Sequence, residues 1–213
     1  MGTYVNPVYP YRAPDDLRAT PPQRRPLIVV GAGPVGLAAA IDARQHGLPV
    51  LLFDEDKTVS VGSRAVCYAK RALEVLDRLG LGETPCAKGV SWNVGRTFMQ
   101  EEEVYRFNLV PEAGHKRPGM INLQQYHLEE MLIARALEVG ADIRWQHKVI
   151  SVQPQADHAR VTVETPDGSF DIEADWLIVA DGARSPIRRQ LGLDIEGRIF
   201  MDRFLIADVV MKA

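Results

Sequence analysis

The sequence predicts an α/β fold in which helices pack against a parallel sheet, and three features support this prediction. The first is a short apolar run, Leu27–Val30, of the kind that forms a buried parallel strand. The second is the glycine-rich turn GAGPVG, which follows directly at positions 31–36. The third is a segment with helical periodicity and then a second apolar run, Pro49–Phe53. This order of elements is typical of a dinucleotide-binding unit.

The glycines of this turn follow G-x-G-x-x-G spacing, and each has its own physical reason. Gly31 allows the tight strand-to-helix turn, Gly33 lets a pyrophosphate approach the backbone, and Gly36 lets the helix pack close to the strand. Pro34 lies between the last two glycines and belongs to the same candidate site. The free N–H groups and the positive end of the helix would then face the anion. The motif alone is weak, but the elements around it strengthen the prediction.

Length and composition are those of an ordinary globular protein, and they exclude several classes. The 213 residues are 46% hydrophobic and 25% charged, which suits one domain, or one domain and part of another. The net charge is −3, whereas nucleic-acid-binding domains are typically basic, so no nucleic-acid partner is expected. The apolar runs are far shorter than the ~20 residues of a membrane span, so no membrane partner is expected. Without a signal-peptide apolar core, the expected location is the cytoplasm.

Cysteine and histidine spacing predicts no metal site. Cys67 and Cys86 form neither a disulfide framework nor a zinc-binding spacing, so we expect reduced thiols. The five histidines show no metal-binding pattern, and no G-x-S-x-G motif supports an esterase.

Periodicity and turn residues predict the remaining elements. We expect helices at 34–46, 67–79, 122–139 and 186–191. We expect strands at 49–53, 90–98, 104–110, 141–145, 148–154, 160–165, 169–172, 176–180 and 200–211. The turn Pro166-Asp167-Gly168 lies inside a predicted β-meander. Residues 1–25 hold five prolines and are expected to form an extended arm, on the surface or disordered, with partner binding as an alternative.

An acidic residue at the end of the second strand extends the dinucleotide prediction. Asp54 lies 18 residues beyond Gly36, near the spacing at which a carboxylate accepts hydrogen bonds from ribose hydroxyls. Glu55 and Asp56 are adjacent, so the choice among the three stays open. A solvated acidic turn is the plain alternative.

Six motifs in order resemble a known family. They are GAGPVG, the acidic strand end at Asp54, Ser63-Arg64-Ala65, RALEVLDRLGL, INLQQYHLEEML and ADWLIVADGARSPIRRQLGL. Together they resemble the class A FAD-dependent aromatic hydroxylases over about residues 26–213. Within that family the chain looks like the N-terminal part of 3-(3-hydroxyphenyl)propionate hydroxylase-like monooxygenases, which act on phenolic acids.

The resemblance implies a Rossmann-like FAD-binding fold with a parallel sheet, a β-meander and the beginning of a substrate-binding sheet. Residues 26–89 and 118–195 would form the FAD-binding domain, and 90–117 and 196–213 part of a substrate-binding domain, after the arm at 1–25. The family's later Gly-Asp motif does not follow in this sequence. We therefore expect a truncated hydroxylase that alone hydroxylates little or nothing.

The resemblance also assigns cofactor contacts. Gly31, Gly33, Pro34 and Gly36 would hold the FAD pyrophosphate. Asp54 would bind the adenosine ribose, and Arg64 would contact the phosphates or the ribose through its guanidinium. The plain alternative for Arg64 is a surface arginine.

The remaining implied contacts come from the second half of the chain. Gln125, with Gln124 as its alternative, would reach the flavin side, and the backbone of Val149 would meet the adenine. Asp181 and Gly182 would bind the pyrophosphates of FAD and NAD(P)H. The plain alternatives are a helix-start glutamine and an Asp-Gly turn.

The implied activity is hydroxylation of a small phenolic substrate with FAD as cofactor, NAD(P)H as co-substrate and O₂. The sequence identifies no catalytic residue, and a homodimer is an open alternative to a monomer. Two other functions stay open: an FAD oxidoreductase of the same fold that does not hydroxylate, and an inactive nucleotide-binding module completed by another chain. A dehydrogenase that binds only NAD is disfavoured, because the β-meander and the Asp181-Gly182 strand end suit the FAD fold.

Overall fold

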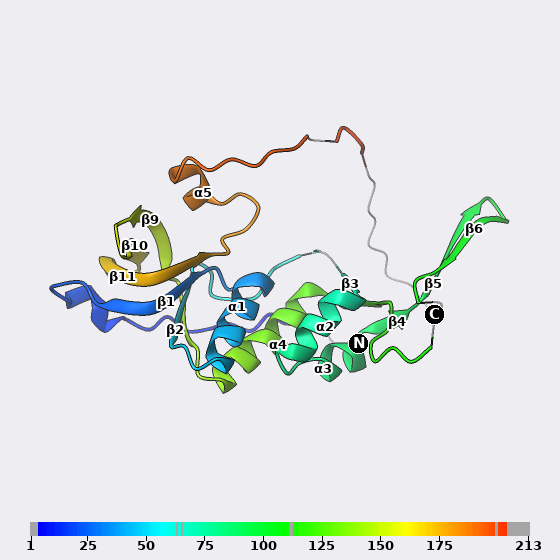
Figure 1. Cartoon of the computed structure of the whole chain (residues 1–213), viewed down its shortest axis with the longest axis horizontal. Helices are drawn as coiled ribbons and strands as arrows, with labels where there is room; N and C mark the ends of the chain where they lie inside the picture. Colours follow the sequence, from blue (N-terminus) through cyan, green and yellow to red (C-terminus); the bar gives the residue numbers. More distant parts are fainter. Residues whose placement is uncertain (1–3, 63, 65, 111–112, 199, 204–213) are drawn as a thin grey trace.

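The computed structural model describes residues 4–62, 64, 66–110, 113–198 and 200–203. Its centre is a six-stranded sheet in the order β8-β2-β1-β11-β10-β9 (Figure 1). In that order the strands are Asp142–Trp145, Val50–Asp54, Arg24–Val30, Gly168–Val179, Ala159–Thr165 and Lys148–Pro154. The pairs β8-β2, β2-β1 and β1-β11 are parallel, whereas β9, β10 and β11 are antiparallel neighbours. The predicted α/β fold with a parallel sheet and a β-meander is confirmed.

Both faces of the parallel sheet are buried at β1 and β2, which explains the unbroken apolar run in β1, whereas the end of β11 exposes Trp176. Alternate residues of a strand point to opposite faces. Leu27 and Val29 belong to one apolar cluster with the helices, and Ile28 and Val30 belong to a second cluster with the meander. Figure 1 shows helices α1, α2, α3 and α4 gathered on one side of the sheet. They span Pro34–Gln45, Lys70–Arg78, Glu83–Lys88 and Gln125–Glu138.

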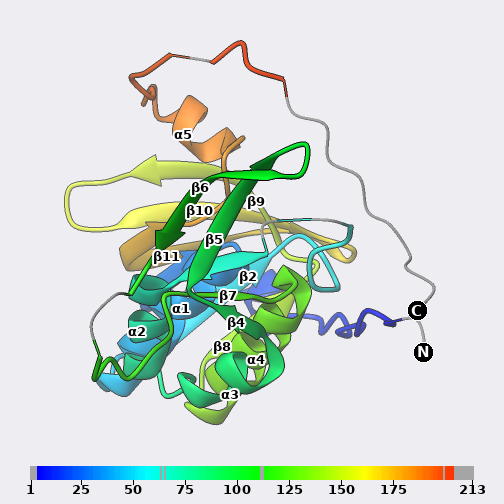
Figure 2. The same cartoon turned by 90° about the vertical axis from the view of Figure 1, so that its right-hand side faces the viewer.

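Two small sheets lie outside the central one. Strands β3 (Cys67–Ala69), β7 (Met120–Asn122) and β4 (Val90–Trp92) form an antiparallel sheet. Strands β5 (Val94–Met99) and β6 (Glu102–Asn108) form a hairpin that projects from the body (Figure 1). Figure 2 shows the hairpin in front of the body, from the side toward which it projects. The hairpin confirms the prediction of paired strands in this region.

Several predicted boundaries are wrong, because pairing between distant segments decided them. The helix predicted at 67–79 begins with the short strand β3, which pairs with β7. The helix predicted at 122–139 begins only at Gln125, because β7 ends at Asn122. The strand predicted at 90–98 is two strands, β4 and β5. Asn93 separates them, because its carbonyl and its side chain bind the backbone of Leu109 and Gly119. Helix α3 was not predicted.

The two strands predicted at 169–172 and 176–180 are one strand, β11. Its first half pairs with β10 and its second half with β1, so a single strand serves the meander and the parallel sheet. The final helix α5 (Pro186–Gln190) is as predicted, and Ser185 Oγ accepts a hydrogen bond from the backbone N–H of Arg188 at 2.9 Å. Of the strand predicted at 200–211, residues 200–203 are neither helix nor strand, and the rest lies outside the described residues.

Residues 4–23 lie along the body of the protein and are mostly extended. They contain one 3₁₀ turn, η1 (Asp15–Arg18). The Tyr9 ring stacks on Trp145 with 4.4 Å between ring centroids, and the Asp16 side chain is buried against Arg144 and Arg25. This part of the arm is therefore packed against the fold rather than disordered. Among the described residues, no helix has both the length and the apolar character needed to cross a bilayer.

Candidate cofactor site

The glycine turn joins β1 to α1 at the carboxyl edge of the parallel strands. The Gly31 N–H donates to the carbonyl oxygen of Phe53 at 2.8 Å, which fixes the turn to the end of β2. Gly31 has a φ of 100°, a conformation that side chains disfavour. A Cβ there would also lie 2.5 Å from the carbonyl oxygen of Ala180, the residue that follows β11. A glycine is therefore required at position 31 for two independent reasons.

Gly36 and Gly33 have opposite surroundings. A Cβ on Gly36 would collide with the carbonyl oxygen of Gly31, so the first turn of α1 packs directly on the glycine turn. A Cβ on Gly33 would meet no atom within 4 Å. Gly33 is the N-cap of α1, Pro34 is its first residue, and the described first turn carries no acidic side chain. The backbone at Gly33 is thus open to a ligand, and no acidic side chain within the first turn of α1 offsets the positive end of the helix.

Asp54 lies at the end of β2 and contacts the glycine turn. Its Oδ2 accepts a hydrogen bond from the Ala32 N–H at 2.5 Å, and its Oδ1 accepts one from the Asp56 N–H at 2.8 Å. Burial raises the pKa of Asp54 above its ordinary value, while the two backbone hydrogen bonds act in the opposite direction. Each carboxylate oxygen keeps a further acceptor position for a hydroxyl group. Glu55 instead forms an ion pair with Lys148, with 3.0 Å between Glu55 Oε2 and Lys148 Nζ.

Asp181 and Gly182 follow β11 and lie beside the same turn. The Ala180 N–H donates to the Val30 carbonyl oxygen at 2.8 Å, which holds the end of β11 against the end of β1. Asp181 Oδ2 accepts a hydrogen bond from the Ile187 N–H at 3.4 Å, and Gly182 has a φ of 86°. A hollow of about 450 Å³ lies here, and its lining includes Val35, Asp181, Gly182 and Arg188. The structure thus brings the first and last predicted motifs together.

The other residues predicted to contact the cofactor lie on elements outside the glycine turn. Gln125 begins α4, and its Nε2 donates to Glu129 Oε1 at 2.7 Å, while Gln124 is the exposed N-cap. Val149 lies in β9 with a buried side chain, and its backbone pairs with β10 at Val163. Arg64 is exposed, and its neighbours Ser63 and Ala65 lie outside the described residues. Among the described residues, no hydrogen bond or ion pair joins Arg64 to the glycine turn.

Sequence reasoning missed two buried polar groups near this edge. Glu129 is only 4% exposed, and its Oε2 accepts a hydrogen bond from the Ser60 N–H at 2.6 Å. His147 is buried beside Phe53, its backbone N–H donates to the Asp54 carbonyl oxygen at 2.8 Å, and burial lowers the pKa of its imidazole. Glu129 stands four residues after Gln125 on an inward helix face, and that spacing could have signalled it.

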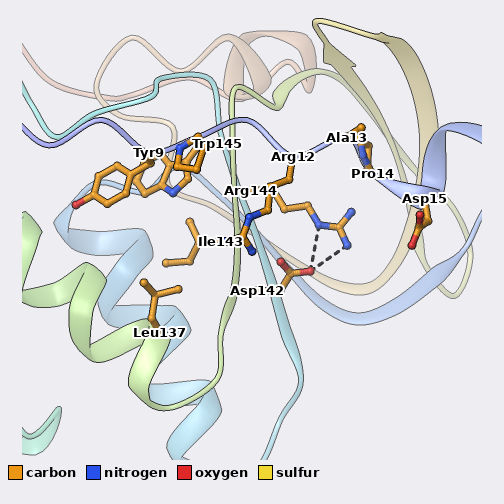
Figure 3. Close-up of a pocket in the computed structure, with 11 residues that line it drawn as sticks. Tyr9, Arg12, Ala13, Pro14, Asp15, Leu137, Asp142, Ile143, Arg144 and Trp145 are labelled. Carbon is orange, nitrogen blue, oxygen red and sulfur yellow. Dashed lines mark hydrogen bonds and ion pairs between the residues drawn. The ribbon is translucent and has the colours of Figure 1, made fainter.

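A second hollow, of about 260 Å³, lies between the arm and β8 (Figure 3). Tyr9, Arg12, Asp142, Arg144 and Trp145 are among the residues that line it. Its lining includes none of the predicted cofactor contacts, so it is separate from the site at the glycine turn.

Comparison with known proteins shows which cofactor is bound by proteins of this fold family. The family described as "FAD binding domain" matches residues 24–213. The chain belongs to this FAD-binding family. The resemblance to FAD-dependent aromatic hydroxylases is confirmed, and FAD is the cofactor of the fold.

Relatives of this chain include several monooxygenases. A para-nitrophenol 4-monooxygenase of a Pseudomonas species is 31% identical over 188 residues, covering 86% of this chain and 46% of the relative. A 12-dehydrotetracycline 5-monooxygenase/anhydrotetracycline 6-monooxygenase of Streptomyces rimosus subsp. rimosus is 31% identical over 175 residues, covering 82% and 34%. The crystal structure of a p-nitrophenol 4-monooxygenase from Pseudomonas putida has a TM-score of 0.77 at 27% identity, covering 83% and 46%. This FAD-binding chain therefore spans between a third and a half of the length of these proteins.

Proposed function

We propose that this chain is the FAD-binding portion of a monooxygenase that hydroxylates a small phenolic compound, using NAD(P)H as electron donor and O₂ as oxygen source. The observation that carries the proposal is the close approach of Gly31 to Ala180. It places the glycine turn beside Asp181 and Gly182 at one edge of the sheet. The substrate class rests on the relatives, because the para-nitrophenol enzyme is named for a phenol.

The residues of the site fit FAD. The open backbone at Gly33 and the start of α1 would bind the pyrophosphate, with Gly31 and Gly36 providing the close packing that the turn needs. Asp54 would accept hydrogen bonds from the adenosine ribose. Asp181 and Gly182 would lie along the other side of the same phosphates. Bound FAD supplies two-electron redox chemistry with NAD(P)H and O₂.

The proposal includes three further contacts with FAD, which are predictions from the sequence. Gln125 would reach the flavin side, Arg64 would contact phosphate or ribose, and the Val149 backbone would meet the adenine. We also propose that residues 90–117 and 196–213 belong to a substrate-binding domain. The proposed location of the protein is the cytoplasm, and the proposed oligomeric state is a monomer, with a homodimer as the alternative.

One observation favours a second candidate function. The β5–β6 hairpin exposes several large apolar side chains, among them Phe98, Met99 and Tyr105. An apolar hairpin of this kind is typical of a surface that another part of a protein covers. A nucleotide-binding module completed by another chain therefore remains the alternative, and it would bind FAD without hydroxylating by itself.

A binding experiment tests the proposal. The purified chain is incubated with FAD or with NAD⁺, free nucleotide is removed, and the absorbance spectrum is recorded. We expect the flavin bands to remain with the protein after FAD incubation. Retention of NAD⁺ with no retention of FAD would contradict the proposal. Consumption of NAD(P)H with matched phenol hydroxylation by this chain alone would overturn both the expectation that it hydroxylates little or nothing and the inactive-module alternative.

A further inference from the structure

The first segment of the arm contacts the loop that leaves the cofactor site. We call residues 4–11 the arm segment and residues 55–62, which follow Asp54 directly, the Asp54 loop. The Tyr9 N–H donates to the Lys57 carbonyl oxygen at 2.7 Å. The Asn6 side-chain amide donates to the carbonyl oxygens of Val59 and Ser60 at 3.5 and 3.4 Å. The arm segment thus donates hydrogen bonds to three backbone carbonyl oxygens of the loop.

Helix α4 also holds this loop. The buried Glu129 carboxylate accepts the Ser60 N–H at 2.6 Å with one oxygen and the Gln125 amide at 2.7 Å with the other. Ser60 therefore receives a donor from Asn6 at its carbonyl and gives its N–H to Glu129. A continuous set of hydrogen bonds runs from the arm segment through the Asp54 loop to Gln125, one of the predicted flavin contacts.

Aromatic stacking anchors the arm segment at both ends of this contact. The Tyr4 ring stacks on Tyr126 of α4 with 4.0 Å between centroids. The Tyr9 ring stacks on Trp145 at the end of β8, as Figure 3 shows. Burial raises the pKa of the Tyr9 hydroxyl, which is consistent with a ring held against the body. These rings fix the arm segment on two elements, so its polar groups are in place to position the loop.

We propose that the arm segment positions the Asp54 loop for FAD binding, with Asn6 as a positioning residue. The proposal rests on the proposed function, because it assumes that Asp54 and Gln125 face the cofactor. The family match begins at residue 24, so it assigns no role to residues 4–11. A loop that is already ordered does not have to be ordered when the ligand binds, and the affinity is higher for that reason.

The test compares the 213-residue chain with three variants. Asn6→Asp keeps the shape of the side chain but replaces the donor amide with an acceptor that faces two carbonyl oxygens. Removal of residues 1–11 takes away every contact of the arm segment. Val8→Ala is the matched control, because Val8 lies in the same segment and is 69% exposed. FAD affinity is measured by quenching of flavin fluorescence at a temperature where circular dichroism shows each protein folded. Hydrogen exchange of the Ser60 amide is followed without FAD.

We expect Asn6→Asp to weaken FAD binding by about three- to tenfold, as for the loss of one or two modest hydrogen bonds. We expect the deletion to weaken it more, and both variants to speed exchange at Ser60. Val8→Ala should leave both measurements unchanged. If Asn6→Asp binds FAD normally and its Ser60 amide exchanges normally, the inference is overturned but the proposed function is not. A fall in thermal stability of this variant would not change that conclusion. Failure of the unmodified chain to bind FAD would instead overturn the proposed function, and the inference with it.

Discussion

The Asp54 carboxylate accepts a hydrogen bond from the Ala32 N–H at 2.5 Å, which joins the end of the second parallel strand to the middle of the glycine turn. The glycine turn and Asp54, the two predicted parts of the nucleotide site, are therefore hydrogen-bonded to each other without a ligand. Asp54 is half-buried here, and burial raises the pKa of its carboxyl group. A ribose hydroxyl would join a carboxylate that the backbone already orients.

Asp54→Asn tests the role of this carboxylate. We expect FAD affinity to fall about tenfold, because a charged acceptor is lost and the new amide opposes a backbone N–H. Thermal stability of the ligand-free protein should change little, since relief of the buried charge offsets the lost hydrogen bond. FAD titration and thermal unfolding measure the two effects. Glu55→Gln is the control at the neighbouring position, and a loss of affinity in that variant instead would assign the ribose to Glu55.

Gly36→Ala tests the packing of α1 on the glycine turn. The added Cβ would collide with the Gly31 carbonyl oxygen, so the helix and the turn must move apart. Such overpacking destabilises by about 1–3 kcal/mol. Urea unfolding of the ligand-free protein measures this effect, and a variant as stable as the unmodified chain would show that the packing is looser than the structure has it.

Asp77→Asn tests an ion-paired cluster and predicts a pH dependence. Asp77 accepts hydrogen bonds from Arg117 and Lys116, and the Arg117 guanidinium lowers the pKa of Asp77 far below its ordinary value of 3.8. A carboxyl group whose pKa is lower when folded stabilises the protein above its unfolded pKa, and this stabilisation is lost as the pH falls through the folded pKa. Asp77→Asn should therefore lower the unfolding midpoint at pH 7.

The difference between Asp77→Asn and the unmodified chain should shrink as the pH falls below about 4. Thermal unfolding across a pH series measures it. Glu138→Gln is a suitable control, because Glu138 is exposed and its pair with Arg135 is of the surface kind that contributes little. An equal loss at pH 7 and at pH 3 would mean that shape, rather than charge, explains the effect.

The part of this molecule that the sequence predicted is the part that depends on local chemistry. The glycine spacing, the apolar run of β1 and the Ser185 cap each need only neighbouring residues, and each is found in the structure. The strands β3 and β7 were missed because Cys67–Ala69 pairs with residues more than fifty positions away. Helical periodicity cannot reveal such a pairing.

The candidate site shows the same division between local and distant contacts. The motif order predicted that the glycine turn and Asp181-Gly182 belong together, and Ala180 does lie against Gly31. The contacts of the arm segment with the Asp54 loop were not predicted, because a run of prolines and tyrosines carries no spacing that names its partner. The buried Glu129 that joins Gln125 to Ser60 was also missed, for it depends on tertiary contacts.

Gly33→Val gives the most direct test of FAD binding at the glycine turn. A Cβ at Gly33 would meet no protein atom within 4 Å, so we expect the fold to tolerate a valine there, while the space for the pyrophosphate is filled. Ala87→Val, at an exposed position of α3, is the control for added volume. Fluorescence titration with FAD should show binding to the unmodified chain and to Ala87→Val, and a loss of at least about tenfold in Gly33→Val. Equal FAD affinity in all three proteins, with circular dichroism unchanged, would contradict the placement of FAD at this turn.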